Sequence, residues 1–150
     1  MKKLIIIIVG SLIIFSGEIS AAPKEYGDIN NVVYVRNYDG DTITFNVPNF
    51  HPVIGHNIPI RVNGIDTPEM RGKCKEEKTL AIKAKELVKT ALMNAEKINL
   101  KNIKRGKYFR IVADVEFRGR FGFFNIKDLL IKSNLAVQYD GDTKIKDWCK

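Results

Sequence analysis

Five runs of alternating apolar and polar residues, separated by turn-forming residues, most constrain how this 150-residue chain can fold. Alternation places every second side chain on one face, as in a strand that packs against a core on one side. The first two runs flank Asp39-Gly40, a dipeptide typical of hairpin turns. The last would place Phe109 and Ile111 on the apolar face and Arg110 on the other. The predicted strands lie within residues 32–47 (two strands), 58–65, 96–103 and 108–117.

Residues from about Lys75 to Ala95 follow a helical period instead. Several lysines lie off the apolar stripe, and we interpret them as a solvated face rather than a DNA site. The stripe consists of Leu80, Ala84, Leu87, Val88, Ala91, Leu92 and Ala95.

The remaining segments are shorter. Residues 48–59 carry Pro and Gly and are expected to form a loop. Asn125, with Asp128 three residues later, is typical of a helix N-cap, and residues 135–138 are expected to pair briefly. Five strands with a helix after the third favour a mainly β (α+β) fold of the small-barrel type. The sequence does not determine the order of the strands.

The N-terminal residues are typical of a secretory signal peptide. A basic start precedes an apolar run at residues 4–15. As a helix this run would span about 18 Å, short of the roughly 30 Å of a hydrocarbon core. Small residues follow, so we expect cleavage after Ala21 or Ala22. The chain would then consist of a signal peptide at 1–21 and one domain at 22–150, secreted or periplasmic.

The chain contains 25 Lys and Arg against 17 Asp and Glu, a net charge of +8. Signal cleavage would remove two lysines and one glutamate, so the excess belongs to the mature domain. Such a surface favours an anionic partner, either nucleic acid or an acidic surface. Charge alone does not separate a nuclease from a protein that binds DNA weakly and nonspecifically.

The two cysteines, Cys74 and Cys149, are expected to form one disulfide. An exported chain with an even number of cysteines favours this pairing. A structural zinc site would need about four ligands, and His51 and His56 do not stand at zinc-motif spacing. The bond would join the start of the long helix to the C-terminal tail.

The stretch RVNGIDTPEM, which begins at Arg61, contains the strongest chemical signal. Asp66 and Glu69 flank Thr67-Pro68, and the proline stiffens the turn and leaves the Thr67 carbonyl free of helix bonds. Two carboxylates and a carbonyl on a stiff turn suit a hard cation such as Ca²⁺. The same residues also fit an ordinary helix-entry turn. Arg61 and Arg110 fit either structural ion pairs or a phosphate clamp.

Together these motifs resemble the thermonuclease family of secreted, Ca²⁺-dependent staphylococcal-nuclease-like enzymes. The match consists of DGDT at 39–42, Arg61 followed by IDTPE at 65–69, and KYFR at 107–110. It extends over about residues 30–138, in the family's order and approximate spacing. The resemblance implies a five-stranded OB-fold barrel with packed α-helices that hydrolyses phosphodiester bonds of DNA and RNA.

The resemblance also implies a role for individual residues. The Ca²⁺ ligands would be two carboxylates and a backbone carbonyl, from Asp41, Asp66 and Thr67. The catalytic residues would be Arg61, Glu69 and Arg110. The substrate-contacting pair would be Lys107 and Tyr108. Glu69 matches the proposed general base, and orienting the water is its alternative role. We expect DNA and RNA as substrates, a monomer, and no stable membrane association after signal cleavage.

The chain departs from the family in three places. Phe109 stands where the family usually has glycine before the second arginine. The loop at 46–59 is longer than in the best-known members. The chain ends near Trp148, without the long C-terminal helix of some members.

The pentapeptide YDGDT occurs twice, at 38–42 and at 139–143. Only the first copy lies between two predicted strands and belongs to the matched motifs. We interpret the second as a surface turn beside the substrate cleft, and we exclude Asp140 and Asp142 as metal ligands.

Two other function classes fit parts of the pattern. A noncatalytic OB-type nucleic-acid-binding module would share the fold, but it would be expected to lose the acidic and arginine positions that this chain keeps. A secreted basic adhesin or membrane-surface protein could use the lysine-rich helix. Hydrolysis of single-stranded DNA, with Ca²⁺ and then with chelator, decides most of this choice, because only the nuclease would cleave the strand.

Overall fold

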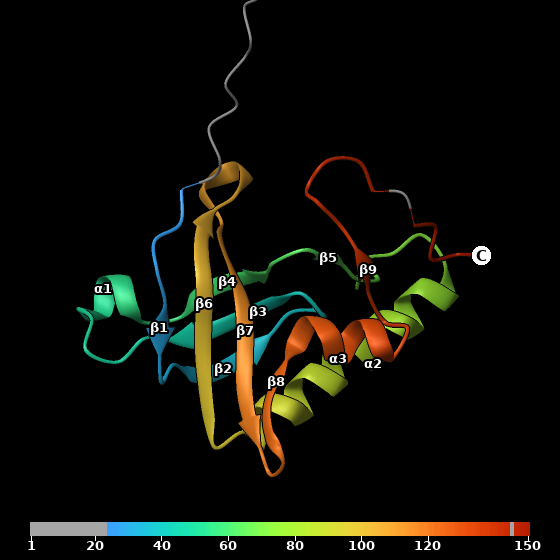
Figure 1. Ribbon diagram of the computed structural model, residues 1–150. Coiled ribbons are helices and arrows are strands. Elements are labelled where there is room, and N and C mark those ends of the chain that lie inside the picture. The colour runs from blue at the N-terminus through green and yellow to red at the C-terminus, as the bar shows by residue number, and fades with distance from the viewer. Residues whose placement is uncertain (1–23, 145) are drawn as a thin grey trace, which may run out of the picture.

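A curled sheet forms the body of the protein in the computed structural model, which describes residues 24–144 and 146–150 (Figure 1). The predicted signal peptide lies outside the described residues. The sheet contains β1 (Ile29–Asn30), β2 (Val33–Asn37), β3 (Thr42–Asn46), β4 (Ile58–Val62), β6 (Lys97–Arg105), β7 (Ile111–Gly119) and β8 (Gly122–Asn125). A separate two-stranded sheet contains β5 (Ile65–Asp66) and β9 (Val137–Gln138).

The strands are ordered β1-β6-β7-β4-β3-β2, with β8 paired to β7. Strands β4 and β7 pair in parallel, and the other neighbours are antiparallel. The five predicted strands correspond to β2, β3, β4, β6 and β7. The predicted fold class, a mainly β OB-type domain with packed helices, is therefore confirmed. The parallel β4–β7 pairing brings the third and fifth predicted strands together, which the sequence left open.

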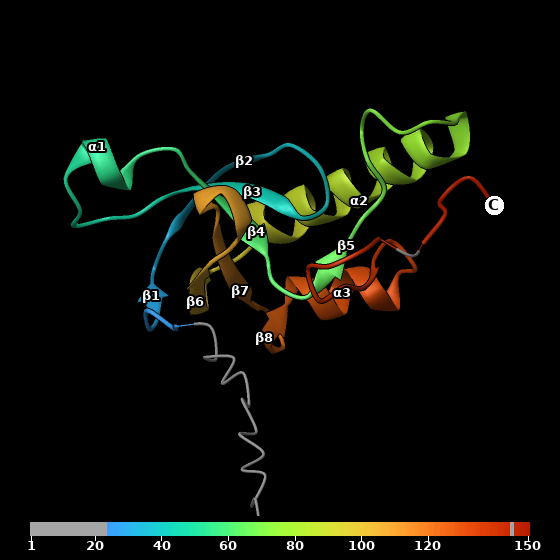
Figure 2. The ribbon, with the colours of Figure 1, turned by 90° about the horizontal axis from the view of Figure 1, so that it is seen from above.

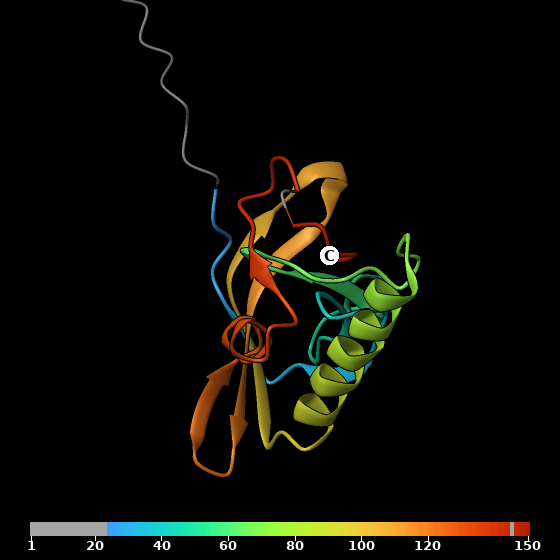
Figure 3. The ribbon, with the colours of Figure 1, turned by 90° about the vertical axis from the view of Figure 1, so that its right-hand side faces the viewer.

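Three helices accompany the sheet: α1 (Pro52–Gly55), α2 (Lys75–Met93) and α3 (Ile126–Lys132). Figure 2 shows α1 on the opposite side of the molecule from α2 and α3, and Figure 3 shows α2 running along one side of the sheet. The predicted cap of α3 is confirmed, because the Asn125 side chain accepts a hydrogen bond from the Lys127 amide at 2.8 Å. None of the helices in the described ranges is long and apolar enough to cross a membrane.

The core lies between the concave side of the sheet and the two longer helices. Burial of such apolar side chains stabilises a fold by about 1.5–3 kcal/mol each. The sheet contributes Ile43, Phe45, Ile60, Val62, Leu100, Ala113 and Val115, all at most 1% exposed. The helices contribute Ala81, Ala84, Val88, Ile126 and Leu130, which are fully buried. The apolar stripe predicted for residues 75–95 therefore packs into this core along α2.

The predicted strand at 108–117 begins later than expected, at Ile111. Tyr108 and Phe109 have φ values of 59° and 58°, in the left-handed region, and they belong to a short 3-10 turn. The Gly106 amide donates to the Arg110 carbonyl at 2.8 Å, which closes this turn between β6 and β7. Phe109 is consequently 85% exposed, and the prediction that it lies on the apolar face is wrong.

The predicted loop at 48–59 contains one helical turn, α1. His51 caps this turn, because its Nδ1 accepts from the Val53 amide at 3.3 Å.

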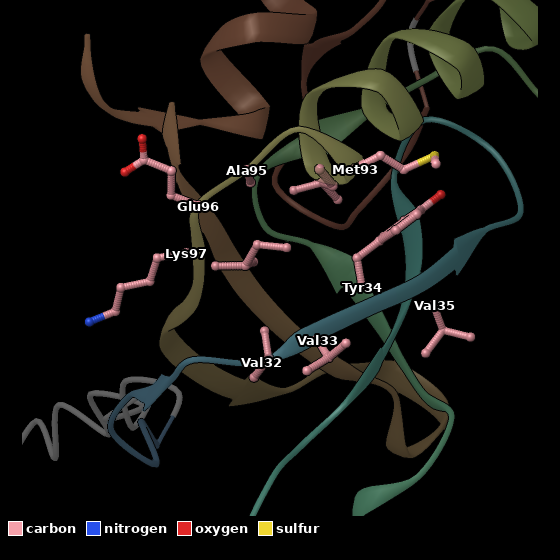
Figure 4. A pocket seen from close by; sticks show the side chains of 10 residues that line it. Val32, Val33, Tyr34, Val35, Met93, Ala95, Glu96 and Lys97 are labelled. Carbon is pink, nitrogen blue, oxygen red and sulfur yellow. The ribbon is translucent and has the colours of Figure 1, made fainter. Parts of the chain in front are cut away.

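The face shared by Val33 and Val35 of β2 is exposed, and with Met93 it lines a pocket of about 490 Å³ (Figure 4). This pocket shares no lining residue with the basic cleft described below.

Candidate active site

The turn between β2 and β3 buries the first predicted acidic residue. The Asp39 side chain accepts from the backbone amides of Asp41 at 3.1 Å and Thr42 at 2.8 Å, which folds the turn tightly. Gly40 packs so closely that a Cβ atom there would lie 2.9 Å from the Thr67 methyl carbon. Asp41 is therefore held in the interior, 2% exposed, beside the Asp-Thr-Pro turn.

Arg61 connects the two acidic turns. Strand pairing places it opposite Thr42, and its guanidinium donates to Asp41 Oδ1 at 2.7 Å. The same guanidinium lies 3.8 Å from Asp66 Oδ1 and donates to the Ile65 carbonyl at 3.4 Å. A single arginine thus bridges carboxylates that are 25 residues apart in the chain, and the burial of both carboxylates strengthens the interaction.

Asp66 carries the least satisfied polar atom of the site. The Trp148 indole N–H donates to its Oδ2 at 3.5 Å. Its Oδ1 is buried and receives no aligned hydrogen bond, although the Lys144 ammonium lies only 2.7 Å away. That short distance represents an ion contact rather than a directed hydrogen bond. A buried carboxylate oxygen that is in contact with a cationic group but lacks an aligned hydrogen bond is suited to a cation ligand.

Glu69 lies at the edge of the same site. Its side chain is 46% exposed, and its Oε1 lies 2.6 Å from the Lys144 ammonium. The buried Glu77 of α2 holds the turn from below, since its carboxylate accepts from the amides of Glu69 at 3.3 Å and Lys73 at 2.9 Å. Glu69 is therefore anchored by its backbone while its carboxylate faces solvent.

The predicted disulfide between Cys74 and Cys149 is confirmed, with the two Cα atoms 5.9 Å apart. Cys74 also caps α2, because its sulfur accepts from the Glu77 amide at 3.3 Å. These three side chains form a cluster with metal-like spacing. Both sulfurs are bonded to each other, so neither is a thiolate that could bind a metal. The bond instead fastens the C-terminal tail to the start of α2.

Two pKa values are displaced in the site. Burial raises the pKa of Asp41 to about 7, and the charge of Arg61 only partly opposes this effect. Burial acts to lower the pKa of Lys144, but contacts with Asp66 and Glu69 outweigh it and raise that pKa above its ordinary value. The site therefore combines a carboxylate that lacks sufficient positive charge nearby with an ammonium held by its neighbours. Additional positive charge beside Asp41 would favour its ionised form.

A cleft of about 650 Å³ opens beside these residues. Glu69 lies on its wall together with a group of basic side chains, which suits a polyanionic ligand. The basic lining residues are Arg61, Lys104, Arg105, Lys107, Arg110 and Lys144.

The predicted substrate residues come from the turn between β6 and β7. Arg110 and Lys107 line the cleft, whereas the Tyr108 ring is 86% exposed and lies outside the lining. The Arg110 guanidinium lies 5.8 Å from the centre of that ring. The structure thus brings Asp41, Arg61, Asp66, Thr67 and Glu69 together and places Arg110 and Lys107 elsewhere on the cleft wall. Their chemical roles stay predictions.

The second YDGDT copy also borders the cleft, as expected for a surface turn there. The Lys107 ammonium donates to the Gly141 carbonyl at 2.8 Å. Figures 1 and 3 show the turn after β6 and the chain after β9 side by side. Asp142 is 85% exposed at its side chain and contacts Lys107 at 3.7 Å.

Sequence reasoning missed three residues that shape the site: Glu77, Lys144 and Trp148. Glu77 lies on the buried side of α2, one turn before the apolar stripe. Glu77 stands four residues before Ala81 and seven before Ala84, so it lies on the same helix face as these alanines, and this spacing could have indicated a buried acid. Lys144 and Trp148 lie in a tail whose sequence has no helical or strand periodicity. Only the predicted pairing of the cysteines indicated that this tail lies close to the site.

Comparison with known proteins supports the family assignment. The model of the staphylococcal nuclease homologue family matches residues 59–147. A protein of Schizosaccharomyces pombe described as a probable endonuclease is 34% identical over 87 residues, which is 56% of this chain and 37% of the relative. The chain thus spans well under two thirds of that relative's length. The matched family region contains Arg61, Asp66, Glu69 and Arg110, whereas Asp41 precedes it and joins the site through the fold. This chain belongs to the staphylococcal nuclease homologue family.

Proposed function

We propose that this protein is an exported, Ca²⁺-dependent endonuclease that hydrolyses phosphodiester bonds of DNA and RNA. The observation that carries the proposal is the convergence of Asp41, Asp66 and Glu69 with Arg61 beside a basic cleft. Basic groups attract the phosphate backbone of nucleic acids. Carboxylates in the same place oppose simple phosphate binding, but they are useful where a divalent cation and a water molecule must be positioned.

The residues present fit a hard cation. Asp66 offers a buried oxygen without an aligned hydrogen bond, and the pKa of Asp41 is raised by its burial, so that a further positive charge beside it would stabilise its ionised form. Asp41, Asp66 and the Thr67 carbonyl would hold Ca²⁺. When bound, the cation would lower the charge barrier to attack on the phosphate and help to position the water.

The chain's own residues would perform the other tasks. Glu69 would accept the proton of the attacking water or orient that water, which is typically worth about 10²–10⁴ in rate. Arg61 and Arg110 would donate to phosphate oxygens whose charge grows in the transition state. Lys107 and Tyr108 would contact a neighbouring part of the substrate, with the exposed Tyr108 ring available for base stacking.

A simple assay tests this proposal and its alternative, a noncatalytic nucleic-acid-binding module. The purified mature protein is mixed with single-stranded DNA or RNA in Ca²⁺ and then in excess chelator. We expect endonucleolytic cleavage that stops in chelator, with single strands cleaved faster than duplex. Undiminished cleavage in chelator would contradict the metal assignment. Tight nucleic-acid binding without cleavage, in protein that binds Ca²⁺, would favour the noncatalytic module.

A further inference from the structure

The C-terminal tail places a lysine against two carboxylates of the proposed site, the metal ligand Asp66 and the catalytic Glu69. The Lys144 ammonium lies 2.7 Å from Asp66 Oδ1 and 2.6 Å from Glu69 Oε1. It therefore occupies the space beside Asp66 Oδ1, a buried carboxylate oxygen that lacks an aligned hydrogen bond. The sequence motifs that define the site assign neither a substrate role nor a metal role to a lysine at this position.

The contact differs from an ordinary surface ion pair, which contributes little because two flexible side chains must be ordered. One partner, Asp66, is 4% exposed at its side chain. The tail is also held on both sides of Lys144. Before it, the Lys107 ammonium binds the Gly141 carbonyl. After it, Trp148 is buried at 8% exposure and Cys149 is bonded to Cys74.

We propose that Lys144 is an internal counter-ion that occupies the cation position of the site and is displaced when Ca²⁺ binds. This inference rests on the proposed function for the identity of the cation. Without the metal, the ammonium neutralises Asp66, whose burial makes an unpaired charge costly, and also pairs with the more exposed Glu69. With the metal, the cation and the ammonium would compete for Asp66 Oδ1, so the lysine must leave.

This arrangement has two consequences for the proposed enzyme. Lys144 lowers the affinity for Ca²⁺, so the site fills only at high Ca²⁺ concentration. It also blocks Glu69, because the ammonium occupies the space at Oε1 where a water molecule would have to lie. The disulfide keeps Lys144 at high local concentration near the site, as a tether does for a linked ligand.

The first test measures Ca²⁺ binding by isothermal titration calorimetry in the absence of nucleic acid. Because the protein supplies few ligands to Ca²⁺, we expect a wild-type dissociation constant on the order of 10⁻⁴–10⁻³ M. Lys144→Gln should bind Ca²⁺ about tenfold more tightly or better, since it removes a competing charge in contact with the ligands. Lys144→Arg, which keeps the charge, should resemble the wild type. Lys150→Gln removes the same charge from the exposed end of the tail and should change little.

The second test follows the lysine itself. Amine acetylation, quantified by mass spectrometry, should be slow at Lys144 relative to Lys150 in metal-free protein and should accelerate at Lys144 when Ca²⁺ is added. A Cys74→Ser/Cys149→Ser variant should show faster acetylation of Lys144 without Ca²⁺ and tighter Ca²⁺ binding. In the variant without the disulfide, Lys144→Gln should increase the Ca²⁺ affinity little further, because the disulfide and the lysine act through the same contact.

The outcomes separate this inference from the proposed function. Equal Ca²⁺ affinity in the wild type and Lys144→Gln would overturn the inference while leaving a Ca²⁺-dependent nuclease intact. Acetylation of Lys144 that does not respond to bound Ca²⁺ would overturn it in the same way. Nuclease activity that is independent of Ca²⁺, with no Ca²⁺ binding by any variant, would overturn both the metal assignment and the competition.

Discussion

Breaking the bond between Cys74 and Cys149 is expected to destabilise the whole domain, because the loop that it closes contains most of the fold. The cysteines are 75 residues apart, and both long helices and strands β6 to β9 lie between them. Closing a loop of this length removes unfolded-state entropy worth at most about 4.5 kcal/mol at 25 °C. For a domain of this size, 1 kcal/mol corresponds to roughly 3–4 °C in Tm. The expected decrease in Tm is therefore at most about 14–18 °C.

Thermal melting followed by circular dichroism measures this effect. The oxidised protein is compared with reduced protein and with Cys74→Ser/Cys149→Ser, which should melt together at the lower temperature. Reductant should leave the double variant unchanged, which controls for effects of the reagent. Fluorescence of Trp148, the only tryptophan of the chain, reports separately on the tail.

A decrease in Tm below about 3 °C would refute the reasoning. It would mean that the tail detaches without affecting the rest of the domain, so that the cross-link does not constrain the cooperative unit. In that case Trp148 fluorescence would change well before the circular dichroism signal. Coincident transitions would instead support a tail that melts with the core.

The other predictions concern catalysis, pH and export. Glu69→Gln should reduce turnover by about 10² or more in a steady-state nuclease assay, whereas Glu76→Gln, on the exposed side of α2, should not. Arg110→Lys keeps the charge but loses the planar fork, so we expect about a 10²-fold rate loss with an unchanged Tm. Burial raises the pKa of Asp41 to about 7 from 3.8; the stability contributed by this group is complete below pH 4 and is lost as pH rises through 7. The metal-free protein should accordingly lose Tm as the pH rises from about 4 to about 7, and the loss should be smaller in the Asp41→Asn variant. N-terminal sequencing of the exported protein should show cleavage after Ala21 or one residue later.

Local patterns predicted the elements whose residues repeat with a regular period. Alternation located β2, β3, β4 and β6, and the apolar stripe located α2, because each pattern reflects a face that must be buried. Alternation failed at Phe109 since the apolar pattern continues into a turn that reverses the chain. A period of two does not distinguish a strand from an exposed turn that happens to carry an aromatic residue.

The site divides in the same way. Asp66, Thr67 and Glu69 could be predicted to lie together because one stiff turn carries them. Lys144 and Trp148 could not, because tertiary contacts and a disulfide bring them to the site rather than any local preference. Residues placed by a tether have no signature in the spacing of the sequence.

The two YDGDT copies show how far identical local sequence determines chemistry. In both, the first aspartate accepts from an amide two residues later, at 3.1 Å in each case, so the turn chemistry is the same. The glycines differ, since Gly141 has φ of 99° while Gly40 packs against Thr67 and α2. A strand follows only the first copy and pairs Thr42 with Arg61, which places Asp41 in the interior within reach of that arginine. The second copy leaves Asp142 in solvent. A buried acid with displaced pKa therefore arises from the strand and helix around the turn, and the same five residues without them form a polar rim of the cleft.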